Sequence, residues 1–135
     1  MAPQMENTKY ILGGEFRVVV YYEDTDFSGY VYHANYLKFF ERAREEILGV
    51  PRLKELYLQG KHFVVRQCQL FFHKPASHGD ELLIKSRGLE PRGASMLFEQ
   101  EAYRCDAGQW TKIVTGSIEL VSIGPQGQPI RIPLS

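Results

Sequence analysis

The sequence predicts an α+β domain in which a curved antiparallel sheet of five strands wraps around one long helix. The first observation is the order of the elements, with one strand, one long helix and then four strands in succession. The second is the shortness of the gaps between the last four strands, which favours antiparallel hairpins over crossover connections. The third is that one helix cannot cover both faces of such a sheet, so the sheet has to curve around it.

The elements follow from residue type and periodicity. Residues 15–23 are rich in β-branched and aromatic side chains and are expected to form the first strand. Residues 33–48 carry apolar side chains at helical spacing, with Gly49 and Pro51 as the stop signal. A short second helix is expected over residues 52–60. The later strands are expected at 62–74, 81–90, 94–105 and 110–122.

A chain of 135 residues suits a single domain. We expect a flexible N-terminus over residues 1–14, the folded domain over 15–122, and an irregular tail rich in glycine and proline over 123–135. A chain of this length buries roughly two-thirds of the surface that it exposes when unfolded. That burial is enough for an ordinary core without disulfides or structural metals.

Charge and hydropathy argue against several classes of function. Sixteen basic residues balance sixteen acidic ones, whereas proteins that bind nucleic acid or anionic membranes usually carry a basic surplus. No apolar stretch approaches the roughly 20 residues that a membrane-spanning helix needs. The first eight residues lack the apolar core of a signal peptide, so we expect a cytoplasmic protein. In that compartment Cys68 and Cys105 are expected to be small packed residues.

The segment over residues 22–36 is the candidate functional site, because it joins the end of a strand to the start of a buried helix. Asp24 and Asp26 place two carboxylates at alternate positions, and Gly29 permits a sharp or left-handed turn. A helix start presents backbone N–H groups without helical partners, which can stabilise an oxyanion. A carboxylate beside such groups suits acyl transfer. The structural alternative is that both carboxylates cap the helix and shape the turn.

A calcium-binding loop is a second alternative for this segment. Asp24, Asp26, Ser28 and Gly29 match positions one, three, five and six of an EF-hand loop. However, Asn35 stands at position twelve, where a bidentate glutamate is needed, and the preceding residues have the pattern of a strand. The sequence therefore predicts no metal site.

A longer motif continues from this segment into the helix. It consists of Asp24-x-Asp26-x-x-Gly29-x-Val31-Tyr32-His33-x-Asn35-Tyr36, then Phe40-Glu41-x-Ala43-Arg44, and later Pro75-Ala76-x-x-Gly79-Asp80. This motif closely resembles that of the 4-hydroxybenzoyl-CoA thioesterase family of hotdog proteins, and within it the Tol–Pal-associated acyl-CoA thioesterases of bacteria. The likeness extends over residues 15–121, nearly the whole expected domain.

The resemblance implies a hotdog fold and an acyl-CoA thioesterase that needs no metal or redox cofactor. It implies that Asp26 is the catalytic carboxylate and that the backbone N–H of His33 polarises the thioester carbonyl. It also implies a homo-oligomer, either a dimer paired edge to edge or a dimer of dimers. The active site would lie at the subunit interface, with CoA extending over the surface.

Further residues are candidates for contacts with the substrate. The motif contributes Gly29, Tyr32, Asn35, Tyr36 and Glu41, and the charges of Arg87, Arg92 and Lys74 suit the CoA phosphates. Several have structural alternatives: the tyrosines can be core residues, Asn35 can brace the loop, and Glu41 can pair with Arg44, which we favour. The His33 imidazole either orients water or the Asp26 carboxylate, or simply packs.

The chemistry leaves two roles open for Asp26. It can act as a general base on water, or attack the carbonyl and form a mixed anhydride. A helix dipole would lower the pKa of its carboxyl group, whereas burial would raise it. A non-catalytic acyl-CoA or protein-binding scaffold on the same fold is the alternative function. The sequence leaves open the length and type of the acyl group, and whether CoA or acyl carrier protein carries it.

Overall fold

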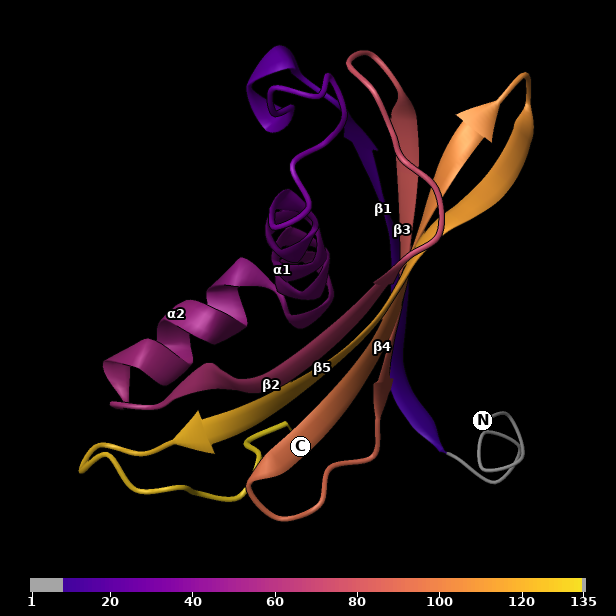
Figure 1. Cartoon of the computed structure of the whole chain (residues 1–135). Coiled ribbons are helices and arrows are strands. Elements are labelled where there is room, and N and C mark those ends of the chain that lie inside the picture. The colour runs from indigo at the N-terminus through magenta and orange to yellow at the C-terminus, as the bar shows by residue number, and fades with distance from the viewer. Residues whose placement is uncertain (1–8, 135) are drawn as a thin grey trace.

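The computed structural model describes residues 9–134, which form one antiparallel sheet with two helices on the same side (Figure 1). The elements are β1 (Tyr10–Val19), the 3-10 turn η2 (Tyr22–Asp24), α1 (Asn35–Leu48), α2 (Val50–Leu58), β2 (His62–Phe72), β3 (Glu81–Leu89), β4 (Ser95–Asp106) and β5 (Gln109–Ile123). The strand order is β1-β3-β4-β5-β2, and the sheet curves around α1. The predicted α+β hotdog fold is therefore confirmed.

The first strand is shifted toward the N-terminus relative to the prediction. β1 begins at Tyr10 rather than at residue 15 and ends at Val19 rather than at residue 23. Gly13 and Gly14, expected to close a flexible segment, instead pair with Arg87 and Ser86 of β3. A Cβ atom at Gly14 would lie 3.1 Å from Ile47 Cγ1, so glycine there lets β1 approach α1 closely. Residues 1–8 of the expected flexible segment lie outside the described residues.

The predicted hairpin between β2 and β3 is wrong. β2 lies at one edge of the sheet beside β5, whereas β3 lies between β1 and β4. Residues 73–80 therefore cross the sheet. Along this segment, backbone N–H groups donate hydrogen bonds to Ile113 O, and a backbone carbonyl accepts one from the Val31 N–H. A gap this short is no proof of a hairpin, because each extended residue spans about 3.3 Å. The other two predicted hairpins, β3–β4 and β4–β5, are confirmed.

The helices differ from the prediction at their ends. α1 begins at Asn35 rather than at residue 33, with Ala34 as its N-cap. It ends where predicted, because Gly49 adopts a φ of 92° that other residues rarely reach. Pro51 does not reinforce that stop but lies in the first turn of α2, a position where its missing N–H costs no helical hydrogen bond.

A buried polar network lies beneath α1, in the middle of the helix–sheet interface. Arg44 Nη1 donates to Gln100 Oε1 at 2.8 Å, and Gln100 Nε2 donates to Phe40 O at 2.9 Å and to Ser86 Oγ at 2.8 Å. Gln100 is fully buried and Arg44 is only 6% exposed. Within residues 9–134, no ion pair of 4.0 Å or less joins Glu41 to Arg44, so the close pairing we favoured from sequence is not formed. Burial lowers the pKa of Arg44, and the nearby charge of Glu41 opposes that shift.

The C-terminal segment after β5 is irregular, as predicted, but it packs against the domain. The Ile130 N–H donates to Ser122 O, and the Ile132 N–H donates to Gly93 O in the turn between β3 and β4. Neither Cys68 nor Cys105 forms a disulfide, and Cys68 is exposed on β2 rather than packed as expected. Among the described helices, none has the length and apolar character needed to cross a membrane.

Candidate active site

Asp24 fixes the loop between β1 and α1. Its Oδ2 accepts a hydrogen bond from the Tyr21 N–H and its Oδ1 accepts one from Asn35 Nδ2, both at 2.8 Å. Its backbone carbonyl accepts a further bond from the Tyr32 N–H at 2.9 Å. These bonds tie the 3-10 turn to the first residue of α1. The Asp24 carboxylate therefore shapes the turn and holds the loop to the start of α1, through its hydrogen bond with Asn35.

Asp26 lies two residues further on, with an exposed carboxylate. Its Oδ1 accepts hydrogen bonds from both the backbone N–H and the side-chain hydroxyl of Ser28. The turn closes through a bond from the Gly29 N–H to Asp26 O, and Gly29 has a φ of 88°. The Ser28 bonds, and secondly the nearby His33 ring, hold the pKa of the Asp26 carboxyl below its usual value. Asp26 is therefore an anion at neutral pH.

At the start of α1, two backbone N–H groups have no partner in the part of the chain that the structure describes. Tyr32 donates to Asp24 O, and Asn35 donates to Tyr32 O. Between them, the N–H groups of His33 and Ala34 donate to no described residue. These are the donors that a helix start offers to an anion or to a developing oxyanion.

One groove of about 330 Å³ brings the predicted catalytic residues together. It is lined by Asp26, Ser28, Tyr30, Val31, His33, Tyr36, Phe72, His73, Lys74 and Pro75. Its walls come from three segments: the loop after β1, the start of α1, and the crossing segment after β2. The His33 ring packs against Tyr32 and Phe72, with ring centroids 4.7 and 6.2 Å apart.

Tyr36 forms the buried part of this groove. Its side chain is 3% exposed, and its ring packs against Phe39 and Phe72 with both centroids 5.9 Å away. Its hydroxyl is buried and has no hydrogen-bond partner among residues 9–134. Burial raises the pKa of Tyr36 to about 12, so the hydroxyl stays protonated and can donate a hydrogen bond.

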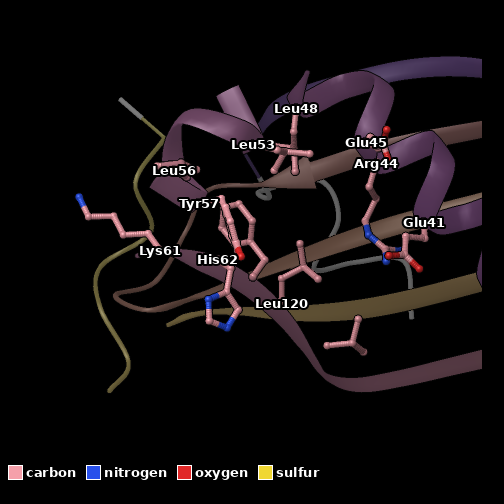
Figure 2. A pocket seen from close by; sticks show the side chains of 12 residues that line it. Glu41, Arg44, Glu45, Leu48, Leu53, Leu56, Tyr57, Lys61, His62 and Leu120 are labelled. Atoms are coloured by element: carbon pink, nitrogen blue, oxygen red, sulfur yellow. The ribbon is translucent and has the colours of Figure 1, made fainter. Parts of the chain in front are cut away.

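Several predicted substrate residues lie outside the groove. Glu41 lines a second cavity of about 260 Å³ between α1, α2 and β2 (Figure 2). The Arg87 guanidinium lies 5.0 Å from the centre of the Tyr10 ring, and Arg92 forms backbone bonds with Ser95 in the turn between β3 and β4. In this chain, therefore, neither Glu41 nor these two arginines meet Asp26.

The sequence analysis missed two groups in or near the groove. From sequence, Ser28 is predicted to be a turn former or a possible metal ligand, and its hydrogen bonds to the Asp26 carboxylate were not predicted. His73 lines the groove and shares a hydrogen bond with Thr115, 2.9 Å from Nε2 to Oγ1. Residues 9–134 contain no cluster of three histidine, cysteine or acidic side chains that could hold a metal ion.

Comparison with protein families and curated proteins gives a consistent result. The model of the thioesterase superfamily matches residues 28–110. The acyl-CoA thioesterase YbgC of Haemophilus influenzae is 43% identical over 95 residues, which are 68% of this chain and 70% of that protein. Its Helicobacter pylori counterpart, also named acyl-CoA thioesterase YbgC, is 44% identical over 64% of this chain and 65% of that protein.

Solved structures show the same likeness. A probable thioesterase from Bartonella henselae is 37% identical, with a TM-score of 0.78 over 90% of this chain and 99% of that one. The 4-hydroxybenzoyl CoA thioesterase of Pseudomonas sp. strain CBS-3 has a TM-score of 0.80 over 91% of this chain and 95% of that one. Its identity of 20% makes it a match in fold alone.

Proposed function

The chain belongs to the thioesterase superfamily, and on that premise we propose that it is an acyl-CoA thioesterase whose catalytic carboxylate is Asp26. The observation that carries this proposal is one groove that contains an ionised carboxylate and, at the start of α1, a backbone N–H group that has no partner among residues 9–134. Hydrolysis of an activated thioester needs a delivered water and a stabilised oxyanion, and these two groups can supply both.

In this mechanism Asp26 acts on water or directly on the thioester. Both Ser28 bonds go to Oδ1, which leaves Oδ2 as the oxygen that can hold a water. As a base, Asp26 takes a proton while the water oxygen adds to the carbonyl carbon; the intermediate then expels the CoA thiolate, which receives that proton. As a nucleophile, an Asp26 oxygen adds to the carbonyl carbon and the C–S bond breaks, which releases the CoA thiolate and leaves a mixed anhydride; water then cleaves this anhydride to the free acid and the Asp26 carboxylate, and the proton lost from the water goes to the thiolate. The exposed position of Asp26 is compatible with both routes.

The His33 N–H is the proposed oxyanion donor. Both His33 and Ala34 have unpartnered N–H groups among the described residues, but only His33 lines the groove. His33 lies before the N-cap of α1, so its N–H is not needed for any helical hydrogen bond. One such donor contributes about 10²–10³-fold to the rate of acyl-transfer enzymes.

We also propose that the protein is a homo-oligomer in the cytoplasm. It is at least a dimer, and of the two assemblies we favour the dimer of dimers. β2 supports this assembly because it is an exposed edge strand of 11 residues, paired with β5 alone among the described strands. Its last residue, Phe72, lines the groove, so a second copy paired along β2 would lie beside the site. The two free thiols suit a reducing compartment. Light scattering at micromolar concentration should give a dimer or tetramer, and a fully active monomer would contradict an interfacial site.

The two aspartates of the loop provide a matched test of the catalytic proposal. Asp26→Asn should lower kcat by about 10²–10⁴-fold, the range for loss of general acid–base catalysis. Asp24→Asn should change kcat much less, because Asp24 holds the loop and an asparagine keeps one acceptor oxygen for that purpose. Near-normal turnover by folded Asp26→Asn would remove Asp26 from the mechanism.

A further inference from the structure

The Tyr36 hydroxyl and the Lys74 ammonium group are among the polar groups of the groove that the proposed hydrolysis does not use. The Tyr36 hydroxyl is buried without a hydrogen-bond partner among the described residues. The Lys74 side chain lines the same groove, and within residues 9–134 it forms no ion pair of 4.0 Å or less. Buried hydroxyl groups nearly always have a partner, so an unpaired one on a residue that lines a groove indicates a missing partner, such as a ligand atom.

Both groups lie toward the end of β4. The charges of Arg104 and Asp80 both act on the Tyr36 hydroxyl, so this hydroxyl lies toward the part of the fold where these two residues are. In that part Arg104 Nη1 donates to Pro75 O, next to Lys74 in the chain. The remaining Arg104 nitrogens, Nε and Nη2, donate to the Asp106 carboxylate. Arg104 is therefore occupied. The charge of Lys74 also acts on the Asp106 carboxylate, but within residues 9–134 it forms no close ion pair, so Lys74 is the lysine that the groove offers to an incoming anion.

From this arrangement we infer that the acyl group of the substrate ends in a carboxylate, as in the CoA monothioester of a short dicarboxylic acid, and that Lys74 and Tyr36 bind it. The inference rests on the proposed function and names the substrate class of the same site. A neutral phenol and an ammonium group are both hydrogen-bond donors, and a carboxylate accepts from two donors at once.

The size of the groove favours the acyl end of the substrate over the CoA phosphates. The phosphates are separated from the thioester by the long pantetheine arm, whereas Lys74 and Asp26 line one groove of about 330 Å³. That volume is at the low end of the range of about 300–1,000 Å³ for ligand sites, so it suits a small acyl group. Val31 and Phe72 provide apolar walls for the methylene groups of a four- or five-carbon diacid.

The test compares two thioesters of equal chain length, glutaryl-CoA and pentanoyl-CoA, by kcat/KM. The wild-type protein should prefer glutaryl-CoA by at least about 10-fold, because an analogue without the terminal oxygens leaves both donors unpaired. Lys74→Met should lower the glutaryl-to-pentanoyl ratio by about 10–100-fold, and Tyr36→Phe by about 10-fold. Lys38→Met is the matched control, since Lys38 is exposed on α1 outside the groove, and its ratio should equal that of the wild type.

The melting temperature of Tyr36→Phe separates a ligand contact from a structural one. Loss of a hydroxyl that has no partner should leave the melting temperature unchanged or raise it. A fall of several degrees would mean that the hydroxyl has a structural partner and would overturn its assigned role. Hydrolysis of pentanoyl-CoA as fast as glutaryl-CoA would overturn the inference and leave the proposed function intact. Hydrolysis of neither, nor of any other acyl-CoA, would overturn both.

Discussion

Two regions beneath α1 bury polar groups, and only one of them pairs those groups completely. In the middle of the helix, Gln100 accepts from Arg44 and donates to Phe40 O and to Ser86 Oγ. At the start of the helix, the Tyr36 hydroxyl is buried without a described partner, and the His33 N–H is also unpaired in the described part of the chain.

The difference separates polar groups that stabilise the fold from those that are available for chemistry. A buried group with all its hydrogen bonds made has nothing left to offer a ligand, and its loss leaves its partners unsatisfied. An unpaired group in a groove costs stability in the free protein and regains a partner when the substrate binds. Mutations in the first region should therefore change stability, and mutations in the second should change turnover.

Among the paired and unpaired groups of these two regions, the largest expected effect is at the oxyanion donor. His33→Pro deletes the backbone N–H, and because His33 lies before the N-cap, no helical hydrogen bond is lost with it. The proline variant should lose about 10²–10³ in kcat relative to His33→Ala, which keeps the N–H. Steady-state kinetics with circular dichroism as the folding check would measure this.

The two His33 variants also separate the backbone from the imidazole. Equal activity in two folded variants would place the oxyanion hole elsewhere, for instance at the neighbouring Ala34 N–H. A large loss in both variants would instead give the imidazole a catalytic role. The ring contacts of His33 with Tyr32 and Phe72 predict a packing role, and hence a small loss in His33→Ala.

The second-largest expected effect is on the free energy of unfolding, in the hydrogen-bonded network around Gln100. Gln100→Leu removes the acceptor of the buried Arg44 guanidinium and the donor to two buried oxygens. The free energy of unfolding should fall by about 2–4 kcal/mol in urea titrations. Gln109→Leu, the same change at an exposed strand position, should stay within about 0.5 kcal/mol of the wild type. If Gln100→Leu were as stable as this control, the network would not stabilise the fold.

The smallest effect is on the pH profile. The Ser28 hydrogen bonds lower the pKa of Asp26, so the active carboxylate persists above that lowered pKa and is lost as the pH falls through it. Ser28→Ala removes the hydroxyl but keeps the backbone N–H, and should move the acid limb of kcat/KM to higher pH. Ser28→Thr keeps a hydroxyl and should retain the wild-type limb. An unmoved limb in Ser28→Ala would assign that limb to another group.

The sequence predicted the kinds of element better than their connections. The five strands and the long helix follow from residue type and period, but the crossing segment after β2 does not, because its length fits a hairpin equally well. Asp26 and His33 could be placed together from their positions at a strand end and a helix start. Arg44 and Gln100 were missed as a pair because their contact joins residues 56 positions apart, and no local pattern reports it.

The central claim is tested most directly by release of free thiol from acyl-CoA. The purified protein, incubated with a panel of aliphatic, dicarboxylic and aromatic acyl-CoAs, should release CoA thiol and free acid in equal amounts from at least one of them. The same protein with Asp26→Asn should bind that substrate and release thiol at least about 10²-fold more slowly. Tight binding of acyl-CoA by the wild-type protein with no thiol released would contradict the account and identify a non-catalytic binding protein.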